Sequence, residues 1–423
     1  MDKCEKCGES YKGFFNIKYK WCKPCQINRL KNYTKISGDK KIDEFIQEIN
    51  SKINCYNDLL FEWIPYNQFN DVELIGKGGF STVCSAIWKD GPLNYDVNKM
   101  EWTTRKERAN KKVALKCLID SQNITSEFLS EIKIHTIMNS HHILKAYGIS
   151  QNPVTKEYIM VFEFVEGGSL NDWINKNFIN LSWKNKLKSL FNIFNALDEL
   201  HQKGFVHHDF HTGNILIKNG NFPHISDMGL CREASNNDET KIFGVMPYLD
   251  PNVLKGNPYT QASDIYSAGM IMYFIATGRQ PFANCPHDEF LAINICKGDR
   301  PVINKTEAPK CYVELMEKCW DSSPDKRPKI AELKKEILIF YASYTKNESG
   351  FKTLMKIEKK QEHYEIENQF KEAEEHRKSL SSESNPHLQA IYTSRLLNSF
   401  TKNISKYDNV NNNSVEIIDF TTL

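Results

Sequence analysis

Residues 206–216 read Val-His-His-Asp-Phe-His-Thr-Gly-Asn-Ile-Leu, and they contain the two polar side chains from which the rest of the chain can be interpreted. Asp209 and Asn214 are five positions apart, and Asp227 follows thirteen positions later within the sequence Asp-Met-Gly. One carboxylate can orient or deprotonate a hydroxyl group. An amide oxygen and a second carboxylate are hard ligands of the kind that magnesium prefers. The spacing therefore indicates a site that combines magnesium binding with chemistry on a hydroxyl group.

A glycine-rich turn lies upstream, where residues 72–83 read Val-Glu-Leu-Ile-Gly-Lys-Gly-Gly-Phe-Ser-Thr-Val. The apolar residues on both sides predict two strands, and the glycines between them would let backbone amides approach a phosphate. A simple tight hairpin is the alternative. Residues 112–116 predict a further strand that ends in Lys116, which is either a phosphate ligand or a surface lysine. Helical spacing over residues 128–135 places Glu131 fifteen positions later, as a partner for that lysine, with Glu127 one turn earlier as the alternative.

Two further segments complete an ordered set of motifs. They are Asp-Ile-Tyr-Ser-Ala-Gly at 264–269, and Cys319-Trp320 followed by Pro324, Arg327 and Pro328. In this order, over about residues 70–341, the motifs resemble those of the protein kinase superfamily. Within it the sequence is most similar to the tyrosine-kinase-like group as multiplied in some fungi. The resemblance implies an α+β, bilobal protein kinase fold with a small β-rich lobe and a large helical lobe.

The same resemblance implies a role for each of the residues quoted above. Asp209 would orient the acceptor hydroxyl, and Lys116, paired with Glu131, would hold the phosphates of ATP. Asn214 and Asp227 would bind Mg²⁺. The expected nucleotide contacts are Ile75, Gly76, Lys77, Gly78, Val83, Ala114, Lys116, Phe162 at the gatekeeper position, Glu163 and Val165 at the adenine edge, and Leu216 beneath adenine.

Several positions depart from the family pattern. His208 replaces the arginine that commonly receives an activation-loop phosphate, so we expect that loop phosphorylation is not an obligatory switch. His211 replaces the lysine that is typical of serine/threonine kinases, and Val245 replaces the threonine that often bonds to that lysine. Ser81 stands where the family has a third loop glycine. Because both the lysine and the threonine are replaced, the hydrogen bond between these two family positions, 211 and 245, is absent from the expected pattern.

The segment at 250–252, Asp-Pro-Asn, departs as well, because the family has glutamate where this chain has Asn252. Asparagine cannot form the ion pair with Arg327 that glutamate would form, although a hydrogen bond is available to it, and Asp250 is a candidate substitute. The loop that precedes this segment is polar. It offers Ser235 and Thr240 as candidate acceptors for autophosphorylation.

Three functions are compatible with these motifs. The first is an active protein kinase that transfers the ATP γ-phosphoryl group to Ser or Thr hydroxyls of protein substrates, with tyrosine not excluded. The second is a nucleotide-binding pseudokinase scaffold, which the departures favour but the complete set of phosphate and metal ligands does not. The third is a small-molecule phosphotransferase, which His211 alone supports.

Four of the twelve cysteines cluster near the N-terminus, as two Cys-x2-Cys pairs separated by fourteen residues. Two such pairs can complete a tetrahedron around Zn²⁺, and about 30 residues cannot form a stable core without such a cross-link. We therefore expect a structural, zinc-ribbon-like site. A disordered reduced tail is the alternative, and a redox role is less well supported by the surrounding sequence. The expected ligands are Cys4, Cys7, Cys22 and Cys25.

The net charge, the lack of long apolar runs and the distribution of cysteines argue against nucleic-acid-binding, membrane and disulfide-rich proteins. A formal net charge of +2 implies no bulk attraction to nucleic acid or to a membrane surface. The sequence shows neither a signal peptide nor a run of about 18 apolar residues, so no membrane span is expected. The other cysteines are scattered, which suits reduced thiols in the cytoplasm, with the nucleus not excluded. The sequence says nothing about oligomeric state.

The motifs divide the chain into four expected parts. Within the kinase-like part, residues 88–112 form a long polar insertion that we expect to be a mobile loop. Near the C-terminal end, residues 352–378 predict a charged helix that is solvated or paired with a partner helix. Residues 391–400 and 415–420 are candidate docking segments. The expected parts are a zinc-binding module at 1–30, a linker with an amphipathic helix at 31–69, a kinase domain at 70–341, and a charged helical and disordered tail at 342–423.

Overall fold

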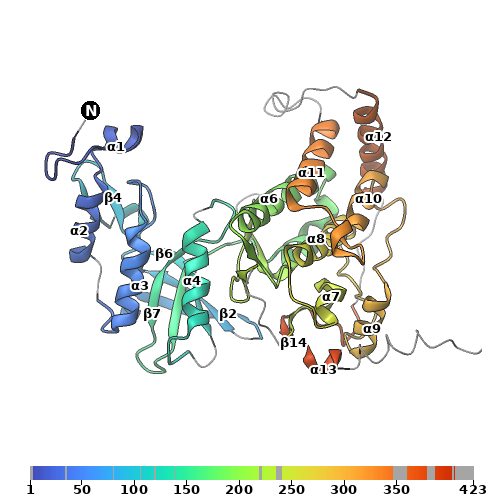
Figure 1. Ribbon diagram of the computed structural model, residues 1–423, viewed down its shortest axis with the longest axis horizontal. Helices are drawn as coiled ribbons and strands as arrows, with labels where there is room; N and C mark the ends of the chain where they lie inside the picture. The colour runs from blue at the N-terminus through green and yellow to red at the C-terminus, as the bar shows by residue number, and fades with distance from the viewer. Residues whose placement is uncertain are drawn as a thin grey trace, which may run out of the picture. The chain divides into compact units, whose positions relative to one another are not determined.

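The chain forms two compact units, residues 1–164 and 165–423, which are described separately (Figure 1). The first unit is built on a β-sheet, and the second is mainly helical. The computed structural model describes residues 3–33, 36–79, 81–104, 106–118, 121–138, 140–218, 222–234, 241–345, 360–378, 386–402 and 404.

A six-stranded sheet with the strand order β1-β7-β8-β6-β3-β2 forms the centre of the first unit. Strands β1 and β7 are parallel, and the other neighbouring strands are antiparallel. Apolar side chains of alternating strand positions, among them Val113, Leu115 and Val161, form its core. The sheet confirms the small β-rich lobe. Its strands are β1 (Glu62–Trp63), β2 (Phe69–Lys77), β3 (Ser81–Trp88), β6 (Lys111–Leu118), β7 (Ala146–Gln151) and β8 (Tyr158–Glu163).

The N-terminal residues pack against an insertion between β3 and β6. Helices α1 (Phe14–Lys18) and α2 (Lys23–Tyr33) belong to the N-terminal part, and the insertion contains a hairpin of β4 (Asn94–Asp96) and β5 (Glu101–Thr103). The expectation of a mobile loop at 88–112 is therefore wrong, because aromatic side chains of the hairpin are buried. They share one apolar cluster with the N-terminal residues, formed by Trp21, Leu30, Ile53, Leu60, Tyr95 and Trp102.

Helix α3 (Lys40–Ser51) confirms the amphipathic helix expected from the sequence. Asp39 caps it by accepting hydrogen bonds from backbone N–H groups of the first turn. The helix lies beside α4 (Ser126–Met138) in Figure 1, and Glu48 forms a 3.3 Å ion pair with Lys133 of α4. Its apolar face is buried and consists of Ile42, Phe45, Ile46 and Ile49.

The second unit confirms the large helical lobe. Helix α8 lies at its centre and is buried along almost its whole length, which agrees with a sequence that is apolar on all sides. The helix begins at a capping box between Thr260 and Ser263 and ends at Gly278, whose φ of 71° suits glycine. The helices of the unit are α5 (Leu170–Asn177), α6 (Trp183–Gln202), α7 (Pro251–Leu254), α8 (Gln261–Thr277), α9 (Glu289–Lys297), α10 (Lys310–Cys319), α11 (Ile330–Thr345), α12 (Lys360–Arg377) and α13 (Asn398–Thr401).

Short strands connect these helices and lie close to Asp209 and Asp227 in sequence. Strand β10 pairs with β11, β9 pairs with β12, and β13 pairs with β14, each pair being antiparallel. Two residues separate the end of β9 from Asp209, and one residue separates the end of β11 from Asp227. The strands are β9 (Phe205–Val206), β10 (Ile215–Lys218), β11 (Phe222–Ile225), β12 (Arg232–Glu233), β13 (Phe243–Gly244) and β14 (Arg395–Leu396).

Helix α12 packs against α6, α10 and α11. Phe370 is fully buried, and its ring contacts those of Trp183 and Phe340. Glu374 accepts a hydrogen bond of 2.9 Å from the backbone N–H of Trp183, at the first turn of α6. The expectation of a solvated helix is therefore wrong for residues 360–378, because a thin apolar stripe is enough to bury one face.

Near this contact, helix α6 carries a buried lysine. The Nζ atom of Lys186 donates a 2.8 Å hydrogen bond to the carbonyl of Ala276 and lies 4.4 Å from the ring centroid of Phe178. Burial, and secondarily the charge of Arg377, lower the pKa of Lys186 from 10.5 to about 7. Lys186 therefore loses its proton at a lower pH in the folded protein than in the unfolded chain.

We expect Lys186→Met to remove a pH dependence from the free energy of unfolding. Between the folded and unfolded pKa values the unfolded chain binds the additional proton, so wild-type stability rises with pH across this window. The full shift is worth roughly 5 kcal/mol, so the stability of the methionine variant relative to wild type should fall by about 3 kcal/mol between about pH 7 and pH 9. Urea unfolding at several pH values measures this difference. Lys188→Met, on the exposed side of α6, is the control, and parallel curves for wild type and Lys186→Met would contradict the prediction.

Residues 386–402 return to the second unit, where β14 adds to β13. Leu397 is fully buried in a cluster that includes Met246 and Leu249. The structure confirms that 391–400 docks, and it shows that the docking is intramolecular. The second candidate, 415–420, lies outside the described residues.

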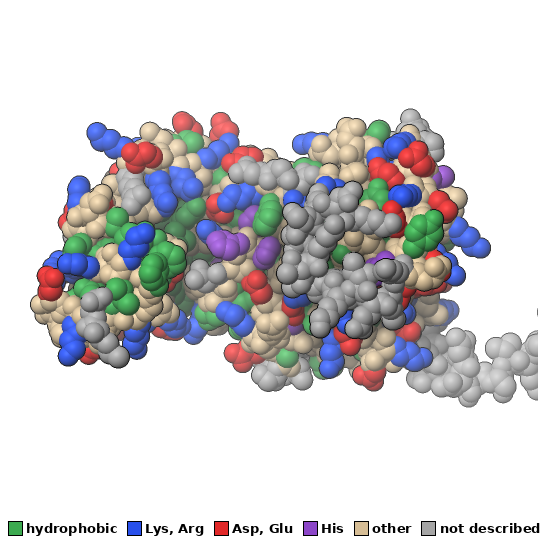
Figure 2. Space-filling view, turned by 90° about the horizontal axis from the view of Figure 1, so that it is seen from above, with side chains coloured by type: hydrophobic (Ala, Val, Ile, Leu, Met, Phe, Trp, Pro, Cys, Tyr) green, Lys and Arg blue, Asp and Glu red, His purple; other side chains and the backbone are tan. Residues whose placement is uncertain are grey.

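The surface carries charges of both signs. In the face shown in Figure 2, Lys and Arg side chains are interspersed with Asp and Glu, in agreement with the formal net charge of +2. None of the helices in the described ranges combines the length and the apolar composition that a membrane crossing requires.

Candidate active site

A buried ion pair in the first unit joins Lys116 of β6 to Glu131 of α4. The Nζ–Oε1 distance is 2.6 Å, and both side chains are buried. The structure thus brings together the two residues that the sequence analysis paired. A buried charge is costly unless it is compensated. The glutamate therefore fixes the position of an ammonium group that is otherwise flexible.

Further residues expected to contact the nucleotide lie on adjacent strands of the same sheet. Gly76 is opposite Val83 in the β2–β3 pair, and Ala114 is opposite Phe162 in the β6–β8 pair. The Gly78 N–H donates a 2.8 Å hydrogen bond across the turn to the carbonyl of Ser81. The remaining members in this unit, on β2 and at the end of β8, are Ile75, Lys77 and Glu163.

In the second unit, the segment that begins at Val165 runs beside the strand that contains Leu216. Gly167 donates to the carbonyl of Ile217 at 3.0 Å, and Ile217 donates to that of Gly168 at 2.9 Å. A Cβ atom at position 167 would lie 2.2 Å from the carbonyl oxygen of Ile217, so the close approach requires glycine. The two nucleotide contacts expected in this unit therefore lie on neighbouring chain segments.

The loop after β9 places Asp209 and Asn214 in direct contact. The Asn214 Nδ2 atom donates to the Asp209 carbonyl at 2.9 Å and to Asp209 Oδ2 at 3.0 Å. The amide nitrogen is thus used inside the loop, and the amide oxygen is the atom suited to a cation. The other carboxylate oxygen, Asp209 Oδ1, is buried and has no hydrogen-bond partner within the described ranges. A buried oxygen of this kind is suited to accept a hydrogen bond from a ligand hydroxyl.

Asp227 is held next to this loop by backbone contacts. The N–H and the hydroxyl of Ser226 both donate to the Asn214 carbonyl, at 2.8 and 3.0 Å. Asp227 itself has a φ of 53°, which is unusual for a residue other than glycine, and its Oδ1 atom accepts a 3.2 Å hydrogen bond from the Gly229 N–H. The two predicted magnesium ligands are therefore tied together through Ser226.

His211 completes the surroundings of Asp209. Its Nδ1 atom accepts a 3.1 Å hydrogen bond from the Gly213 N–H, so the proton of the neutral ring lies on Nε2. That atom is 3.5 Å from Asp209 Oδ2. A Cβ atom at position 213 would lie 2.7 Å from the imidazole, so the arrangement depends on glycine. Burial tends to raise the pKa of Asp209, but the interaction with the neighbouring His211 imidazole lowers it, and the net shift is downward.

Asp264 holds the backbone of the same loop. It accepts hydrogen bonds from the N–H groups of His207 and His208, at 2.8 and 3.2 Å, and from Nε2 of His201 at 2.8 Å. His208 has a φ of 67°, and its ring stacks on that of Tyr259 at 4.4 Å. Asp264 belongs to the motif at 264–269 that the sequence singles out, whereas His201 and Tyr259 carry no local signal in the sequence.

Asp250 takes over the pairing that Asn252 cannot make. The guanidinium group of Arg327 donates to both carboxylate oxygens of Asp250, at 2.6 and 2.9 Å, and both side chains are buried. Asn252 instead donates to Asp250 and to the carbonyl of Ser322. Hydrogen bonds and the charge of Arg327 outweigh burial and lower the pKa of Asp250. The family's ion pair is therefore retained through a different residue.

The loop that precedes this segment is described only in part. Val245 is buried, in keeping with its apolar side chain. Ser235 and Thr240, the candidate acceptors, lie outside the described residues, and their role stays a prediction.

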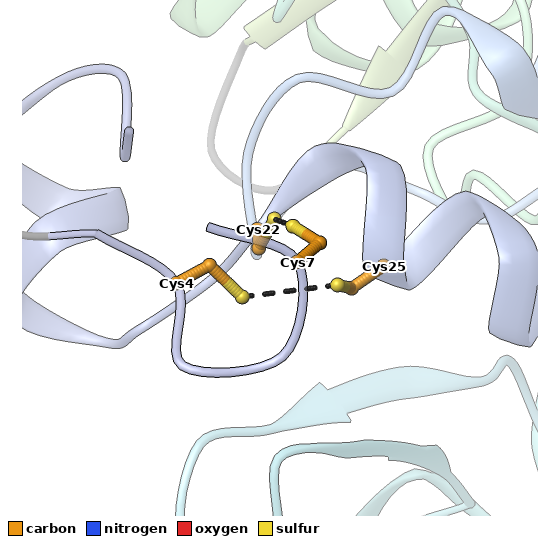
Figure 3. A group of neighbouring side chains, drawn as sticks. All are labelled: Cys4, Cys7, Cys22 and Cys25. Atoms are coloured by element: carbon orange, nitrogen blue, oxygen red, sulfur yellow. Dashed lines mark hydrogen bonds between the residues drawn. The ribbon is translucent and has the colours of Figure 1, made fainter. Parts of the chain in front are cut away.

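The four N-terminal cysteines form a compact cluster (Figure 3). The Sγ atoms of Cys4 and Cys25 are 3.7 Å apart and those of Cys7 and Cys22 are 3.4 Å apart, with all four within 4.8 Å of one another. Four thiolates bound to one Zn²⁺ have sulfur–sulfur separations of about 3.8 Å, so the donor set fits. Burial raises the pKa of Cys22 to about 11, whereas backbone hydrogen bonds outweigh burial and lower that of Cys4 to about 6. A divalent cation would allow all four to ionise together.

Comparison with known proteins agrees with these motifs. A family model described as protein tyrosine and serine/threonine kinase matches residues 69–337. A probable serine/threonine-protein kinase from Dictyostelium discoideum is 28% identical over 275 residues, which are 64% of this chain and 16% of that protein. A probable LIM domain-containing serine/threonine-protein kinase from the same organism is 26% identical over 311 residues, covering 72% and 43% of the two chains. A probable receptor-like protein kinase from Arabidopsis thaliana is 29% identical over 293 residues, covering 63% and 32%. The chain spans less than half the length of each of these relatives.

Proposed function

Because the chain belongs to the family of protein tyrosine and serine/threonine kinases, we propose that it transfers the γ-phosphoryl group of ATP to serine and threonine hydroxyls of proteins. The observation that carries the proposal is the state of Asp209. One of its oxygens is held by Asn214, while the other is buried without a partner in the described part of the chain. An acceptor hydroxyl supplies the missing hydrogen-bond donor.

In the proposed reaction, the acceptor hydroxyl donates a hydrogen bond to Asp209 Oδ1. Its oxygen forms a bond to the γ-phosphorus while the bond to the β-phosphate oxygen breaks, and the hydroxyl proton leaves toward Asp209. Lys116, held by Glu131, binds the α- and β-phosphates. Magnesium, when bound, neutralises charge on the phosphates, and its protein ligands would be Asn214 and Asp227.

His211 takes the place of the usual lysine in this proposal. Its Nε2–H group is directed at Asp209 and can also reach a transferring phosphoryl oxygen as a neutral donor. The hydrogen bond from Gly213 to Nδ1 fixes this tautomer. The substitution therefore changes a positive charge into an oriented dipole and keeps a hydrogen-bond donor at this position.

The pseudokinase alternative loses support from the same geometry. The ion pair that Asn252 cannot form is made by Asp250, and His208 is accommodated by stacking on Tyr259. The similar proteins are named as kinases, which also favours transfer over a scaffold role.

We expect ATP with magnesium to raise the thermal unfolding midpoint of the wild type and to have little effect on Lys116→Met. Nucleotide at about 100 times its dissociation constant stabilises a folded protein by about 2.7 kcal/mol. Methionine keeps most of the volume of lysine but removes the charge that holds the phosphates. Differential scanning fluorimetry with and without ATP and magnesium measures the shift.

Lys112→Met is the matched control, because Lys112 lies on the same strand but packs its ammonium over the ring of Phe164. It should retain the wild-type shift. If the wild type shows no shift at saturating nucleotide, both the kinase and the nucleotide-binding pseudokinase are excluded.

We also propose that the N-terminal cysteine cluster binds one structural Zn²⁺. The support is the tetrahedral spacing of Cys4, Cys7, Cys22 and Cys25. None of the twelve cysteines, all of which the structure describes, forms a disulfide, which supports a reducing compartment such as the cytoplasm. Membership of the tyrosine-kinase-like group is a further proposal, supported by the order of motifs in the sequence.

A further inference from the structure

The segment 386–402, called the tail segment below, forms an extended contact with the second unit. It first follows the loop at 281–288, between α8 and α9. The N–H of His387 donates to the Ala283 carbonyl at 2.8 Å, and the N–H of His287 donates to the Gln389 carbonyl at 3.1 Å. It then pairs with β13 through β14. The tail segment is thus bound by backbone hydrogen bonds to two separate parts of the unit.

Polar and aromatic side chains fix this position. The hydroxyl of Tyr392 donates a 2.9 Å hydrogen bond to the Pro281 carbonyl, and its ring lies edge-on to that of His287 with centroids 4.8 Å apart. The Arg395 guanidinium donates to the His287 carbonyl at 2.6 Å. The Oδ1 atom of Asn398 accepts a 2.8 Å hydrogen bond from the backbone N–H of Ile242, just before β13. These contacts specify one register for the tail segment.

An apolar anchor adds to them. Leu397 is fully buried, and its N–H donates to the Ile242 carbonyl at 2.8 Å. Phe400 packs against the same cluster, which contains Met246 and Val253. Burial of the leucine side chain stabilises this contact, so the tail segment is held by more than its hydrogen bonds.

The residues next to the tail segment are hydrogen-bonded to the loop that contains Asp209 and Thr212. Four residues after β13, the Tyr248 hydroxyl lies 3.3 Å from Thr212 Oγ1, and Thr212 is three residues from Asp209. On the other side, Gln280 precedes Pro281 and donates to Thr212 Oγ1 at 3.1 Å. The chain next to both contacts of the tail segment therefore reaches Thr212, which lies three residues from Asp209, the residue that is proposed to meet the acceptor.

We propose that the tail segment occupies the surface on which an acceptor protein binds, so that the two compete and the tail inhibits transfer in cis. The inference rests on the proposed kinase function. An acceptor whose hydroxyl reaches Asp209 continues as polypeptide on both sides and has to cross the surface around the loop. Extended peptides bind such surfaces by adding to a strand edge, and the backbone groups of residues 242–244 that face the tail segment can serve one strand at a time. The partner is thus an extended, strand-adding segment of a protein substrate.

The test uses a double variant, Arg395→Glu with Asn398→Ala, in the full chain. It removes two tail contacts, leaves Leu397 in place and touches none of the proposed catalytic residues. Hydrogen exchange should show faster exchange of the Ile242 amide. With dephosphorylated casein as acceptor, kcat/KM should rise at least fivefold, mainly through a lower KM for casein, while the KM for ATP stays unchanged. Lys402→Glu, an exposed change in the same segment, should behave as wild type.

A second variant, lacking residues 386–423, removes the tail segment regardless of how the point changes fold. Adding a synthetic peptide of residues 386–402 to it should restore inhibition that is competitive with casein and not with ATP. Equal casein kinetics in wild type and both variants, with the Ile242 amide released, would overturn the inference and leave the proposed function intact. Absence of transfer in every form would overturn the proposed function, and the inference with it.

Discussion

Replacing Asp209 with asparagine is expected to reduce phosphoryl transfer by about 100- to 10,000-fold, the range that a positioned acid–base group contributes. Asparagine keeps the shape of the side chain and a hydrogen-bonding oxygen, but it cannot take up the hydroxyl proton. Because Asp209 is proposed to contact the acceptor and not the nucleotide, the ATP-dependent rise in thermal midpoint should remain close to that of wild type. The measurement is incorporation of radioactive phosphate from ATP into the protein itself and into casein, followed by identification of the phosphorylated residues.

The control for this change is Asp325→Asn, which removes an exposed carboxylate from the same unit. It should leave transfer unchanged. If Asp209→Asn keeps more than about a tenth of wild-type activity, a loss below 1.4 kcal/mol in barrier, Asp209 does not act as proposed. Phosphate found only on tyrosine would keep the kinase proposal and contradict the choice of serine and threonine as acceptors.

Replacing Cys22 with serine is expected to abolish binding of one equivalent of zinc and to unfold the N-terminal part of the first unit. Structural zinc contributes apparent binding free energies of about 10–16 kcal/mol in small zinc modules. Trp21, next to this cysteine, is buried against Trp102 and its neighbours, so loss of the metal also disturbs the inserted hairpin. The measurements are metal content by mass spectrometry and the thermal midpoint, which should fall by about 5 °C or more.

Cys55→Ser is the matched control, because Cys55 lies in the same unit but outside the cluster. It should retain one zinc and the wild-type midpoint. A wild-type protein that is purified under reducing conditions, contains no zinc and gains no stability when zinc is added would refute the metal site.

The candidate active site could be predicted largely because its signals are local. Asp209 and Asn214 lie in one short loop, and the chemistry of hydroxyl activation and magnesium binding requires those side chains. To predict the pairing of Lys116 with Glu131, the sequence had to be interpreted as a strand that is followed by a helix. Asp250 was a candidate partner of Arg327 for the same reason, since it lies two positions before Asn252 in the sequence.

The features that were missed depend on contacts between residues far apart in sequence. The hairpin at 94–103 has strands of three residues, too short for a periodic pattern, and its aromatic side chains are buried only because Trp21 lies against them. Helix α12 has few apolar residues, so its sequence predicts a solvated helix. In the folded chain, Trp183 and Phe340 cover its apolar face. His201 is one of many polar residues on helix α6, and its role becomes visible only when the fold brings Asp264 to it.

The packing of the N-terminal residues against the inserted hairpin also constrains how such a chain can change through evolution. The family match begins at residue 69, yet β1 adds a strand to the sheet from before that point, and Trp21 and Trp102 bury each other across a separation of some eighty residues. A recombination event that exchanged the cysteine module while keeping the hairpin would leave the indole ring of Trp102 without the apolar side chains that cover it. We therefore expect the module and the insertion to be inherited together, as one extension of the small lobe, although they occupy two places in the gene.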